Sequence, residues 1–410
     1  MSELLRLPAR GSAAYRQLVR RRPVTDDIQD QVSGILGAVR DGGDRALLDL
    51  TERYDGVRLT TSRVESDAWQ LALDRLDRGV RAALTETIRR VDLVHRAQQF
   101  HEDAVSVAPG VQVWREWRAF ARVGLYVPGG RTVYPSSVAM MAVPARIAGC
   151  QEIVLCSPPQ RDGQVAPAIL AAAALAGVTE VHAVGGAQAI AALAYGTESI
   201  RRVDKIVGPG NAYVTAAKLQ VVGEVAIDMP AGPSEIVVIS DGSANPRWLA
   251  ADLRAQAEHS PDAIAVLVTT APADAAVVED APEGQILGFQ CETIAEAIAF
   301  ANDFAPEHLT LACTDARRWL SEVTAAGSVF LGPTSPPAAG DYATGANHVL
   351  PTGGAARSFG ALGVADFGRA IQVQAIDASG IDAIAAVTDV LARVEALPWH
   401  ARSVRLRSEP

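Results

Sequence analysis

Apolar residues recur at helical spacing through the first quarter of the chain. Between residues 25 and 105 this spacing predicts amphipathic helices at Ile28 to Val39, Asp44 to Tyr54 and Val80 to Gln99. The pair Gly42-Gly43 lies between the first two and predicts a break there, because glycine weakens a helix interior. Residues 1–21 are basic and lack such periodicity, so we expect an N-terminal arm.

From Arg122 onward, short apolar runs alternate with helical segments. Val123 to Val127 is a predicted strand that ends in Pro128-Gly129-Gly130, and a helix is expected near Ser136 to Ala148. The same alternation predicts further strands at Glu152 to Cys156, Glu180 to Val184, Lys205 to Val207, Glu235 to Ile239, Ala263 to Val268 and Ser328 to Leu331. Strands that alternate with helices imply βαβ units and a parallel sheet buried on both faces.

Two connections and the tail have a different character. Residues 271–289 form an acidic connection that contains Ala and Pro, whereas Pro333 to Gly363 is rich in Gly, Pro and Asn. A loop of the latter length is usually functional or disordered. The tail from Asp366 onward ends in a predicted helix around Ile381 to Ala396 and a basic terminus. A chain of 410 residues is too long for one ordinary core, so two or more domains are expected.

Composition and charge argue against several classes of function. The formal net charge of −10 argues against nucleic-acid binding, which needs clustered Lys and Arg. The longest apolar stretch, around Ala166 to Gly177, is too short for a bilayer, so no membrane association is expected. Charged residues near the N-terminus interrupt any signal-peptide core. Absence of CxxC spacing favours reduced, structural thiols and a cytoplasmic protein; the cysteines are Cys150, Cys156, Cys291 and Cys313.

Glycine-containing turns offer candidate sites for a phosphate or a dinucleotide. They are Pro128-Gly129-Gly130, Gly185-Gly186 and Gly208-Pro209-Gly210, each after a predicted strand and before a helix. Glycine lets the backbone approach a ligand, and a helix N-terminus offers free N–H groups. None of these turns is a GxGxxG, so the Rossmann fingerprint is absent, and any one alone is better explained as an ordinary βα turn.

Two pairs of polar residues could carry chemistry. Gln256 and His259 lie three positions apart near a helix end and share a face, although a histidine that caps carbonyls explains this pattern better. Glu307 and His308 precede a predicted strand, where both can reach one cleft. Such a pair supplies a base near neutral pH and a group that activates water. A solvated carboxylate and a structural histidine explain it equally well.

Further polar residues lie in the Gly-rich loop and in the tail. Asp341 and His348 belong to the loop, where polar side chains often form turns. Glu395 and His400 are five positions apart, and Pro398 breaks the helix between them. A histidine in a tail is by default exposed, so spacing alone assigns no chemistry to these residues.

Taken together, the segments of this chain resemble the histidinol dehydrogenase family over about residues 25–405. The resemblance rests on the number, order and spacing of motifs, none of which would be decisive alone. They are GLYVPGG (124–130), YPSSV (134–138), VGGAQAIAALAYGTESI (184–200), DKIVGPGNAYV (204–214), AGPSEIVV (231–238), AQAEHSPDA (255–263), FAPEHL (304–309), GDYATGANHVLPTGG (340–354) and HARSVRLR (400–407).

The resemblance implies a fold and an activity. The family oxidises L-histidinol to L-histidine through L-histidinal with two NAD+, the last step of histidine biosynthesis. It implies an α/β fold with two Rossmann-like parallel-sheet domains, one zinc ion per subunit, and an intertwined homodimer with shared active sites. The expected boundaries are an arm at 1–21, a discontinuous domain with the catalytic and zinc residues at 22–120 and 234–362, an NAD-binding domain at 121–233, and a tail at 363–410 that reaches the partner subunit.

The resemblance also implies roles for individual residues. Glu307 and His308 are the expected acid/base pair. The expected zinc ligands are Gln256, His259, Asp341 and His400, of which His400 comes from the partner subunit. NAD contacts are expected from Tyr126, Gln188 and Asn211. Substrate contacts are expected from Ser234, Gln256, His259, His308, Asp341, His348, Glu395 and His400.

Some positions depart from the family pattern and leave alternatives open. A paralogue could oxidise another amino alcohol or a sulfonated diol with NAD, and a second alternative is a catalytically silent binding or regulatory paralogue. The intact Glu307-His308 pair favours the enzyme, and Glu395 with His348 favours histidinol. The departures are a short connection at 271–292, Met141 in place of a common Asn, Ser260 in place of a common Asp, and Pro398-Trp399 before His400.

Overall fold

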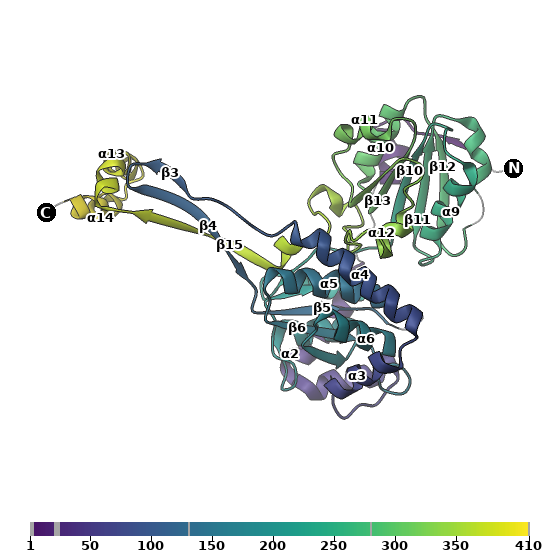
Figure 1. The fold of residues 1–410 in the computed structure, drawn as a ribbon, viewed down its shortest axis with the longest axis horizontal. Coiled ribbons are helices and arrows are strands. Elements are labelled where there is room, and N and C mark those ends of the chain that lie inside the picture. The colour runs from purple at the N-terminus through teal and green to yellow at the C-terminus, as the bar shows by residue number, and fades with distance from the viewer. Residues whose placement is uncertain (1–3, 20–24, 130–131, 279–280, 409–410) are drawn as a thin grey trace.

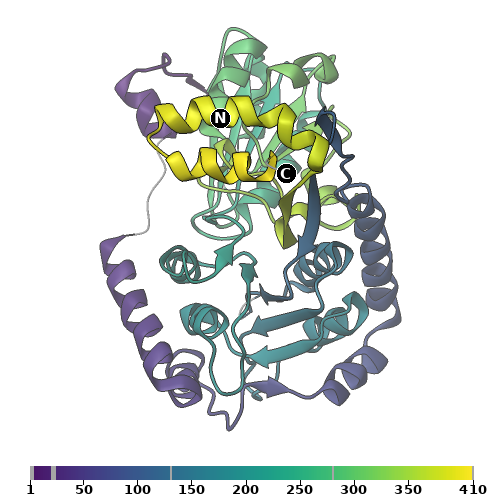
Figure 2. The same ribbon diagram turned by 90° about the vertical axis from the view of Figure 1, so that its left-hand side faces the viewer.

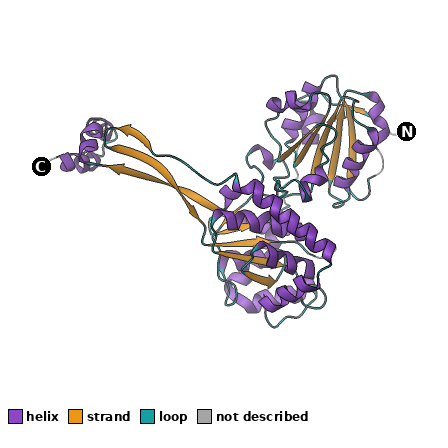
Figure 3. Ribbon diagram, viewed as in Figure 1, coloured by secondary structure: helices purple, strands orange, loops and turns teal. Residues whose placement is uncertain are grey.

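The computed structural model describes residues 4–19, 25–129, 132–278 and 281–408. They form two α/β domains, each around its own sheet, and an antiparallel ribbon that carries two helices away from both (Figure 1). Figure 3 shows the two sheets and the ribbon as separate groups of strands. The predicted α/β class, with parallel-sheet domains and a helical C-terminal tail, is confirmed. Gly130, part of the first predicted glycine turn, lies outside the described residues.

The first domain is built on a six-stranded sheet in the order β2-β7-β6-β5-β8-β9. Its strands are β2 (Arg63–Val64), β7 (Glu180–Ala183), β6 (Glu152–Ser157), β5 (Arg122–Tyr126), β8 (Lys205–Val207) and β9 (Ala226–Ile227). All pairs described within it are parallel except β2 with β7. Helices cover both faces, which is why the central strands are almost entirely apolar.

Each face of this sheet carries two layers of helices. The helices α5 (Pro135–Ala148) and α6 (Pro167–Ala176) pack on one face, while α7 (Gly186–Tyr195) and α8 (Ala212–Gln220) pack on the other. Outside them lie α3 (Ser66–Arg75) and α4 (Arg78–Arg96) on one side, and α2 (Asp26–Asp55) on the other. The inner helices are thus covered from two directions, and few of their residues remain polar. The predicted break at Gly42-Gly43 is a kink inside α2, where Gly43 has φ 55°.

The N-terminal helices belong to this first domain, which corrects the predicted grouping of residues 22–120 with 234–362. The apolar face of α2 contacts α7 and α8, and α3 and α4 contact α6 and α5. The predicted arm at 1–21 instead contributes β1 (Leu5–Arg6) and α1 (Ala13–Val19) to the second domain. An amphipathic pattern identifies the face that is buried but not the surface that buries it, so the sequence could not assign these helices.

The second domain has a parallel sheet in the order β1-β12-β11-β10-β13-β14. Its remaining strands are β12 (Gln285–Gln290), β11 (Ile264–Thr269), β10 (Glu235–Ser240), β13 (His308–Ala312) and β14 (Ser328–Leu331). The helices around it are α9 (Pro246–Ala257), α10 (Ile294–Phe304), α11 (Ala316–Trp319) and α12 (Pro337–Tyr342). The acidic connection predicted at 271–289 is wrong in its last part, because β12 begins at Gln285. Gly288 and polar ends hide this strand from an apolar pattern.

In both domain sheets the order in which the chain adds strands reverses at one point. From β5 the chain moves outward through β6 and β7 and then returns to β8 on the other side of β5. In the second sheet it moves from β10 through β11 and β12 and returns to β13 beside β10. Such a reversal opens a crevice at the carboxyl ends of the strands, where open α/β sheets bind their ligands.

A third, antiparallel sheet forms the ribbon. It consists of β3 (Val105–Ala108), β4 (Val111–Ala119) and β15 (Gly368–Ile376), with Ala119 opposite Gly368 and Val111 opposite Ile376. The ribbon carries α13 (Ala378–Val394) and α14 (Pro398–Ser408) far from both domains, and Figure 2, viewed from the tail end of the molecule, shows the two helices side by side across the view. Large apolar side chains remain exposed there, among them Val394 at 80% and Trp399 at 71%.

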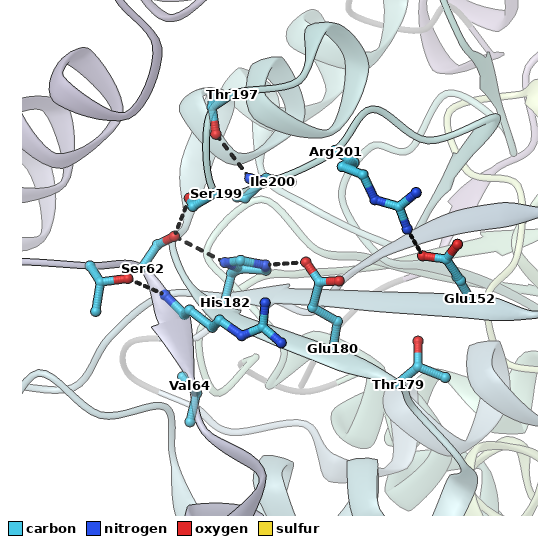
Figure 4. A network of polar contacts seen from close by, with 12 residues as sticks. Ser62, Val64, Glu152, Thr179, Glu180, His182, Thr197, Ser199, Ile200 and Arg201 are labelled. Carbon is cyan, nitrogen blue, oxygen red and sulfur yellow. Dashed lines mark hydrogen bonds and ion pairs between the residues drawn. The ribbon is translucent and has the colours of Figure 1, made fainter.

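Figure 4 shows a polar network that joins the segment after α2 to the sheet of the first domain. His182 of β7 is fully buried, and its Nε2 lies 2.7 Å from Oε1 of Glu180. Its Nδ1 lies 3.0 Å from Oγ of Ser62, which is itself 3.3 Å from Oγ of Ser199. A carboxylate only accepts, so Nε2 carries the proton and Nδ1 accepts from Ser62. Burial lowers the pKa of His182, although Glu180 acts in the opposite direction.

Two further observations concern the predicted reduced cysteines and the predicted absence of a membrane span. Cys150, Cys156, Cys291 and Cys313 are all free and buried, as predicted for structural thiols. Within the described ranges, no helix combines the length and the apolar character needed to cross a bilayer.

Candidate active site

Glu307 and His308 lie together at the amino end of β13. Both are buried, with 8% and 5% of their surface exposed. Oε2 of Glu307 accepts the backbone N–H of Glu235 at 2.9 Å and lies 3.5 Å from Nε2 of Gln256. Gln256 is at the end of α9, which runs back to the amino ends of the strands. The parallel sheet and its crossover helix therefore bring together residues that are 51 positions apart in sequence.

His308 lies between two carboxylates. Its Nδ1 is 3.6 Å from Oε2 of Glu307, and its Nε2 is 3.7 Å from Oδ1 of Asp341. Burial alone would lower the pKa of His308, but the neighbouring carboxylates of Glu307 and Asp341 raise it to about 10. Burial would likewise raise the pKa of Asp341, and His308 lowers it instead. The ring of Phe330 packs beside His308, with centroids 5.8 Å apart.

The loop that carries Asp341 is placed by a glycine. A Cβ at Gly340 would lie 2.8 Å from Cζ of Phe330, closer than side-chain atoms normally approach. Gly340 therefore lets α12 rest against Phe330, and Asp341 follows directly toward His308. The long Gly-rich loop, which was expected to be functional or disordered, contains this short helix, and one of its glycines is required by close packing.

His348 joins this loop to the first domain. Its Nδ1 lies 2.8 Å from the backbone oxygen of Asp341, and its Nε2 lies 3.2 Å from Oγ of Ser137 in α5. The carbonyl can only accept, so Nδ1 donates and Nε2 accepts from the Ser137 hydroxyl. Burial lowers the pKa of His348, which favours this neutral ring. The amino edge of the second sheet is thereby linked to the helix that follows β5.

The expected metal ligands are partly brought together. Nδ1 of His259 faces the backbone oxygens of Ala255 and Gln256 at 3.0 and 3.2 Å, which leaves Nε2 free. A histidine that donates Nδ1–H to a carbonyl while Nε2 is free is the usual arrangement of a metal ligand. His259 is also close enough to contribute to the lowered pKa of Asp341. Among the described residues, however, no group of three or more His, Cys, Asp or Glu could hold a metal.

The expected NAD residues lie at the carboxyl edge of the first sheet. The hydroxyl oxygen of Tyr126, at the carboxyl end of β5, accepts the backbone N–H of Gly186 at 3.1 Å. Gln188 lies two residues further along α7 and is buried. Asn211 caps α8, and its Oδ1 accepts the N–H groups of Tyr213 and Val214. Tyr126 ends β5 and Asn211 follows β8, the two strands at the reversal of strand order, and the Tyr126 hydroxyl links this edge to the start of α7, which carries Gln188.

The remaining expected substrate residues are placed differently. Ser234 is half-buried, and its backbone oxygen accepts from Ile264 beside the amino end of β10. Glu395 and His400 lie at the end of α13 and in α14, exposed and far from both domains (Figure 1). Within one chain, the structure therefore gathers Glu307, His308, Asp341, His348 and Gln256 but leaves the two tail residues apart.

Sequence reasoning did not assign roles to two neighbours of this site. Ser137 contacts His348, and Phe330 packs on His308. Ser137 belongs to the YPSSV segment, whose place at the start of a helix after a glycine turn was a usable signal. Phe330 carried no signal, because an aromatic residue in an apolar strand is ordinarily part of a core.

This arrangement can support proton transfer to or from a bound ligand. A buried imidazole between two carboxylates can exchange a proton with a ligand, and the second carboxylate can act on water. The chemistry of hydride transfer would come from a bound nicotinamide, which the protein would only orient.

The chain is similar over nearly its whole length to proteins of one family. The sequence pattern described as "Histidinol dehydrogenase" matches residues 18–408. A histidinol dehydrogenase from Xanthomonas axonopodis pv. citri (strain 306) is 47% identical over 397 residues, which cover 92% of each chain. One from Methanothermobacter thermautotrophicus is 44% identical and covers 95% of each chain. A crystal structure of histidinol dehydrogenase from Elizabethkingia anophelis has a TM-score of 0.93 and 36% identity, covering 99% of this chain and 98% of that one.

Proposed function

Because the chain belongs to the histidinol dehydrogenase family, and is therefore an oxidoreductase of histidine biosynthesis, we propose how its residues carry out the reaction. The reaction takes L-histidinol to L-histidine through L-histidinal, with one NAD+ reduced in each step. The observation that carries the proposal is the position of His308 between the carboxylates of Glu307 and Asp341.

NAD+ is the proposed hydride acceptor, held by Tyr126, Gln188 and Asn211. Tight backbone approaches at the crevice support this assignment. A Cβ at Gly185 would lie 2.6 Å from Cγ of Pro158, so Gly185 lets the loop after β7 pack directly against the Pro158 ring in the loop after β6. Helix α7 begins there, and the partial positive charge of a helix N-terminus suits an anionic pyrophosphate.

Zinc is the proposed metal, with Gln256, His259 and Asp341 as ligands from one chain. The donor set fits, since a free imidazole nitrogen, a carboxylate and an amide oxygen are N and O donors that Zn²⁺ accepts. Glutamine is an uncommon ligand, and His400 of the partner subunit would add a fourth donor from the protein. A bound zinc ion would offset the charge of Asp341 beside His308 and hold the amine and imidazole of the substrate.

In the first step His308 acts as the base. It takes the proton of the substrate hydroxyl as the hydride leaves the carbinol carbon for NAD+, which gives the aldehyde and NADH. Glu307 faces the other ring nitrogen at 3.6 Å and stabilises the imidazolium that results. Both ring nitrogens of His348 are held, one by the backbone oxygen of Asp341 and the other by Ser137. His348 therefore keeps the loop and the Asp341 carboxylate in place, and its ring is proposed to contact the substrate.

In the second step Glu307 acts on water. The aldehyde must be hydrated before a second hydride can leave, and a carboxylate is a suitable base for that water. The N–H of Glu235 and the amide of Gln256 both point at Oε2 of Glu307 and hold it in position. Ser234, immediately before Glu235, is proposed to contact the substrate.

The tail is proposed to complete the site of a second subunit. Glu395 and His400 are exposed, and the helices that carry them leave large apolar side chains uncovered. A monomeric protein rarely exposes such a surface, whereas an intertwined homodimer would cover it. Each active site would then contain Glu395 and His400 of the partner subunit. We further place the protein in the cytoplasm, because its described cysteines are free thiols.

A direct assay tests the function. Purified protein is incubated with NAD+ and L-histidinol, and in parallel with other amino alcohols and sulfonated diols. NADH formation with L-histidinol, at two NADH per substrate consumed, is expected. A preference for another alcohol would assign the chain to a paralogue with the same chemistry, and no turnover with any of them would contradict the proposed reaction.

A further inference from the structure

A buried ion pair lies behind the nucleotide crevice of the first domain. Lys218 of α8 and Asp228, just after β9, are in contact through Nζ and Oδ1, and each side chain is only 1% exposed. Removing two charges from water is unfavourable, and a buried pair is often no more stabilising than apolar residues of similar size. The stability of the fold is therefore an incomplete explanation for this pair.

Both members of the pair bind the same backbone residue. Oδ2 of Asp228 accepts the N–H of Gly208 at 2.8 Å, and Nζ of Lys218 donates to the carbonyl oxygen of Gly208 at 3.0 Å. Gly208 has φ 132°, which favours glycine, and a Cβ there would collide with the carbonyl oxygen of Tyr126. The pair thus holds Gly208 directly against the end of β5.

Gly208 lies between two residues that are proposed to contact NAD+. Gly208 follows β8 at the reversal of strand order, and the turn that it begins ends at Asn211, the cap of α8. Lys218 lies two turns further along the same helix. Tyr126 and Asn211 are both proposed to contact NAD+. Tyr126 packs directly against Gly208, and Asn211 follows Gly208 by three positions in the same turn, so both are fixed relative to Gly208.

We infer that Lys218 and Asp228 are positioning residues for NAD+, which hold the turn from Gly208 to Asn211 in the shape that binds the dinucleotide. The inference rests on the proposed function. The pair is neutral as a whole and buried beneath the turn, so it acts through geometry and not by attracting phosphate. A turn that is already ordered loses less conformational freedom when a ligand binds.

A second ion pair in the same sheet provides the matched control. Arg122 and Glu180 are 2.9 Å apart, with side chains 6% and 15% exposed. They lie at the first residues of β5 and β7, at the amino edge of the sheet and opposite the crevice. If both pairs serve only stability, disrupting either should lower the free energy of unfolding and leave NAD+ affinity unchanged. If the pair at the carboxyl edge positions the turn, disrupting it should also weaken NAD+ binding.

The test compares Lys218→Met, Asp228→Asn and the apolar double variant Lys218→Met/Asp228→Leu with Glu180→Gln. The dissociation constant of NAD+ is measured by calorimetry, the free energy of unfolding by urea denaturation, and KM for NAD+ and kcat by NADH formation. The double variant removes both charges, so no unpaired charge is left in the core. It still deprives Gly208 of both bonds.

The Lys218 and Asp228 variants, the double variant included, should bind NAD+ about tenfold more weakly or worse, which corresponds to the loss of one or two hydrogen bonds. Their KM for NAD+ should rise in parallel, while kcat at saturating NAD+ changes little. Glu180→Gln should lose stability and keep the wild-type NAD+ affinity.

Wild-type NAD+ affinity in the folded double variant would overturn the inference, as would equal weakening by Glu180→Gln. Failure of the double variant to fold would assign the pair to fold stability and overturn it too. If the unaltered protein itself does not bind NAD+, the proposed function fails instead, and the two failures are distinguishable.

Discussion

Nε2 of His308 lies 3.7 Å from Oδ1 of Asp341, so the proposed general base and a proposed zinc ligand share one electrostatic environment. The carboxylate favours the protonated ring, and a cation on that carboxylate would oppose this effect. Metal binding by Asp341 and proton transfer at His308 are therefore coupled through the Asp341 side chain. The first prediction accordingly concerns the metal.

The purified protein is expected to hold about one zinc ion per chain. Removal of the ion with a chelator should abolish NADH formation and leave the far-UV circular dichroism nearly unchanged, because both sheets have complete cores without it. Metal content is measured by elemental analysis. Asp341→Asn should lower the zinc content, and Asp67→Asn, a change at an exposed position of helix α3 in the first domain, serves as the control. Full activity in a preparation verified to be metal-free would contradict the assignment.

The two catalytic residues should separate the two oxidation steps. Glu307→Gln keeps the shape of the side chain but removes a base, and such a base typically contributes about 10²–10⁴-fold. We expect this variant to slow NADH formation from supplied histidinal by a factor in that range and to affect histidinol oxidation less. His308→Ala should be severely impaired with histidinol. Single-turnover kinetics with each substrate measures both effects, and equal damage to both steps by Glu307→Gln would refute this division of roles.

Mixing two inactive chains should restore activity if the tail completes the partner's site. His400→Ala and His308→Ala are each expected to be inactive as homodimers. Random mixing after mild dissociation would give about half heterodimers with one intact site each, hence about a quarter of wild-type activity. Two differently tagged His308→Ala chains provide the control and should remain inactive. No recovery in dimers purified through both tags would mean that the tail serves its own subunit.

Stability should fall in mildly acidic solution, in part because of His182. Burial lowers the pKa of this histidine in the folded state, so the unfolded chain binds its proton at higher pH. Its contribution is therefore complete above the ordinary histidine pKa of about 6.5 and is lost progressively as the pH falls below it, by up to about 1.4 kcal/mol per pH unit.

Urea denaturation between pH 7.5 and 5 measures this dependence. His182→Gln, which cannot titrate, should have a flatter profile than the unaltered protein. His101→Gln is the matched control, since the His101 side chain is 89% exposed and its loss should leave the slope unchanged. Parallel profiles for the unaltered protein and His182→Gln would show that His182 does not carry the effect.

The sequence by itself determined the local elements and the identity of the chemistry. Apolar runs such as Val123 to Val127 predicted strands buried on both faces, and the glycine pair at Gly42-Gly43 predicted the break in α2. The Glu307-His308 pair was a candidate from its residue types and its place before a strand. Periodicity and turn residues act over a few positions, so their outcome can be inferred without the rest of the chain.

Only the tertiary structure decided which distant parts meet. The sequence did not reveal that α2, α3 and α4 cover the first sheet, because an apolar stripe does not specify its partner. It also did not reveal the ribbon, since β4 and β15 are separated by more than two hundred residues and pair through backbone hydrogen bonds that any side chain permits. Contacts such as Ser137 with His348 arise where two domains meet, and such contacts depend on the packing of whole domains and not on local sequence.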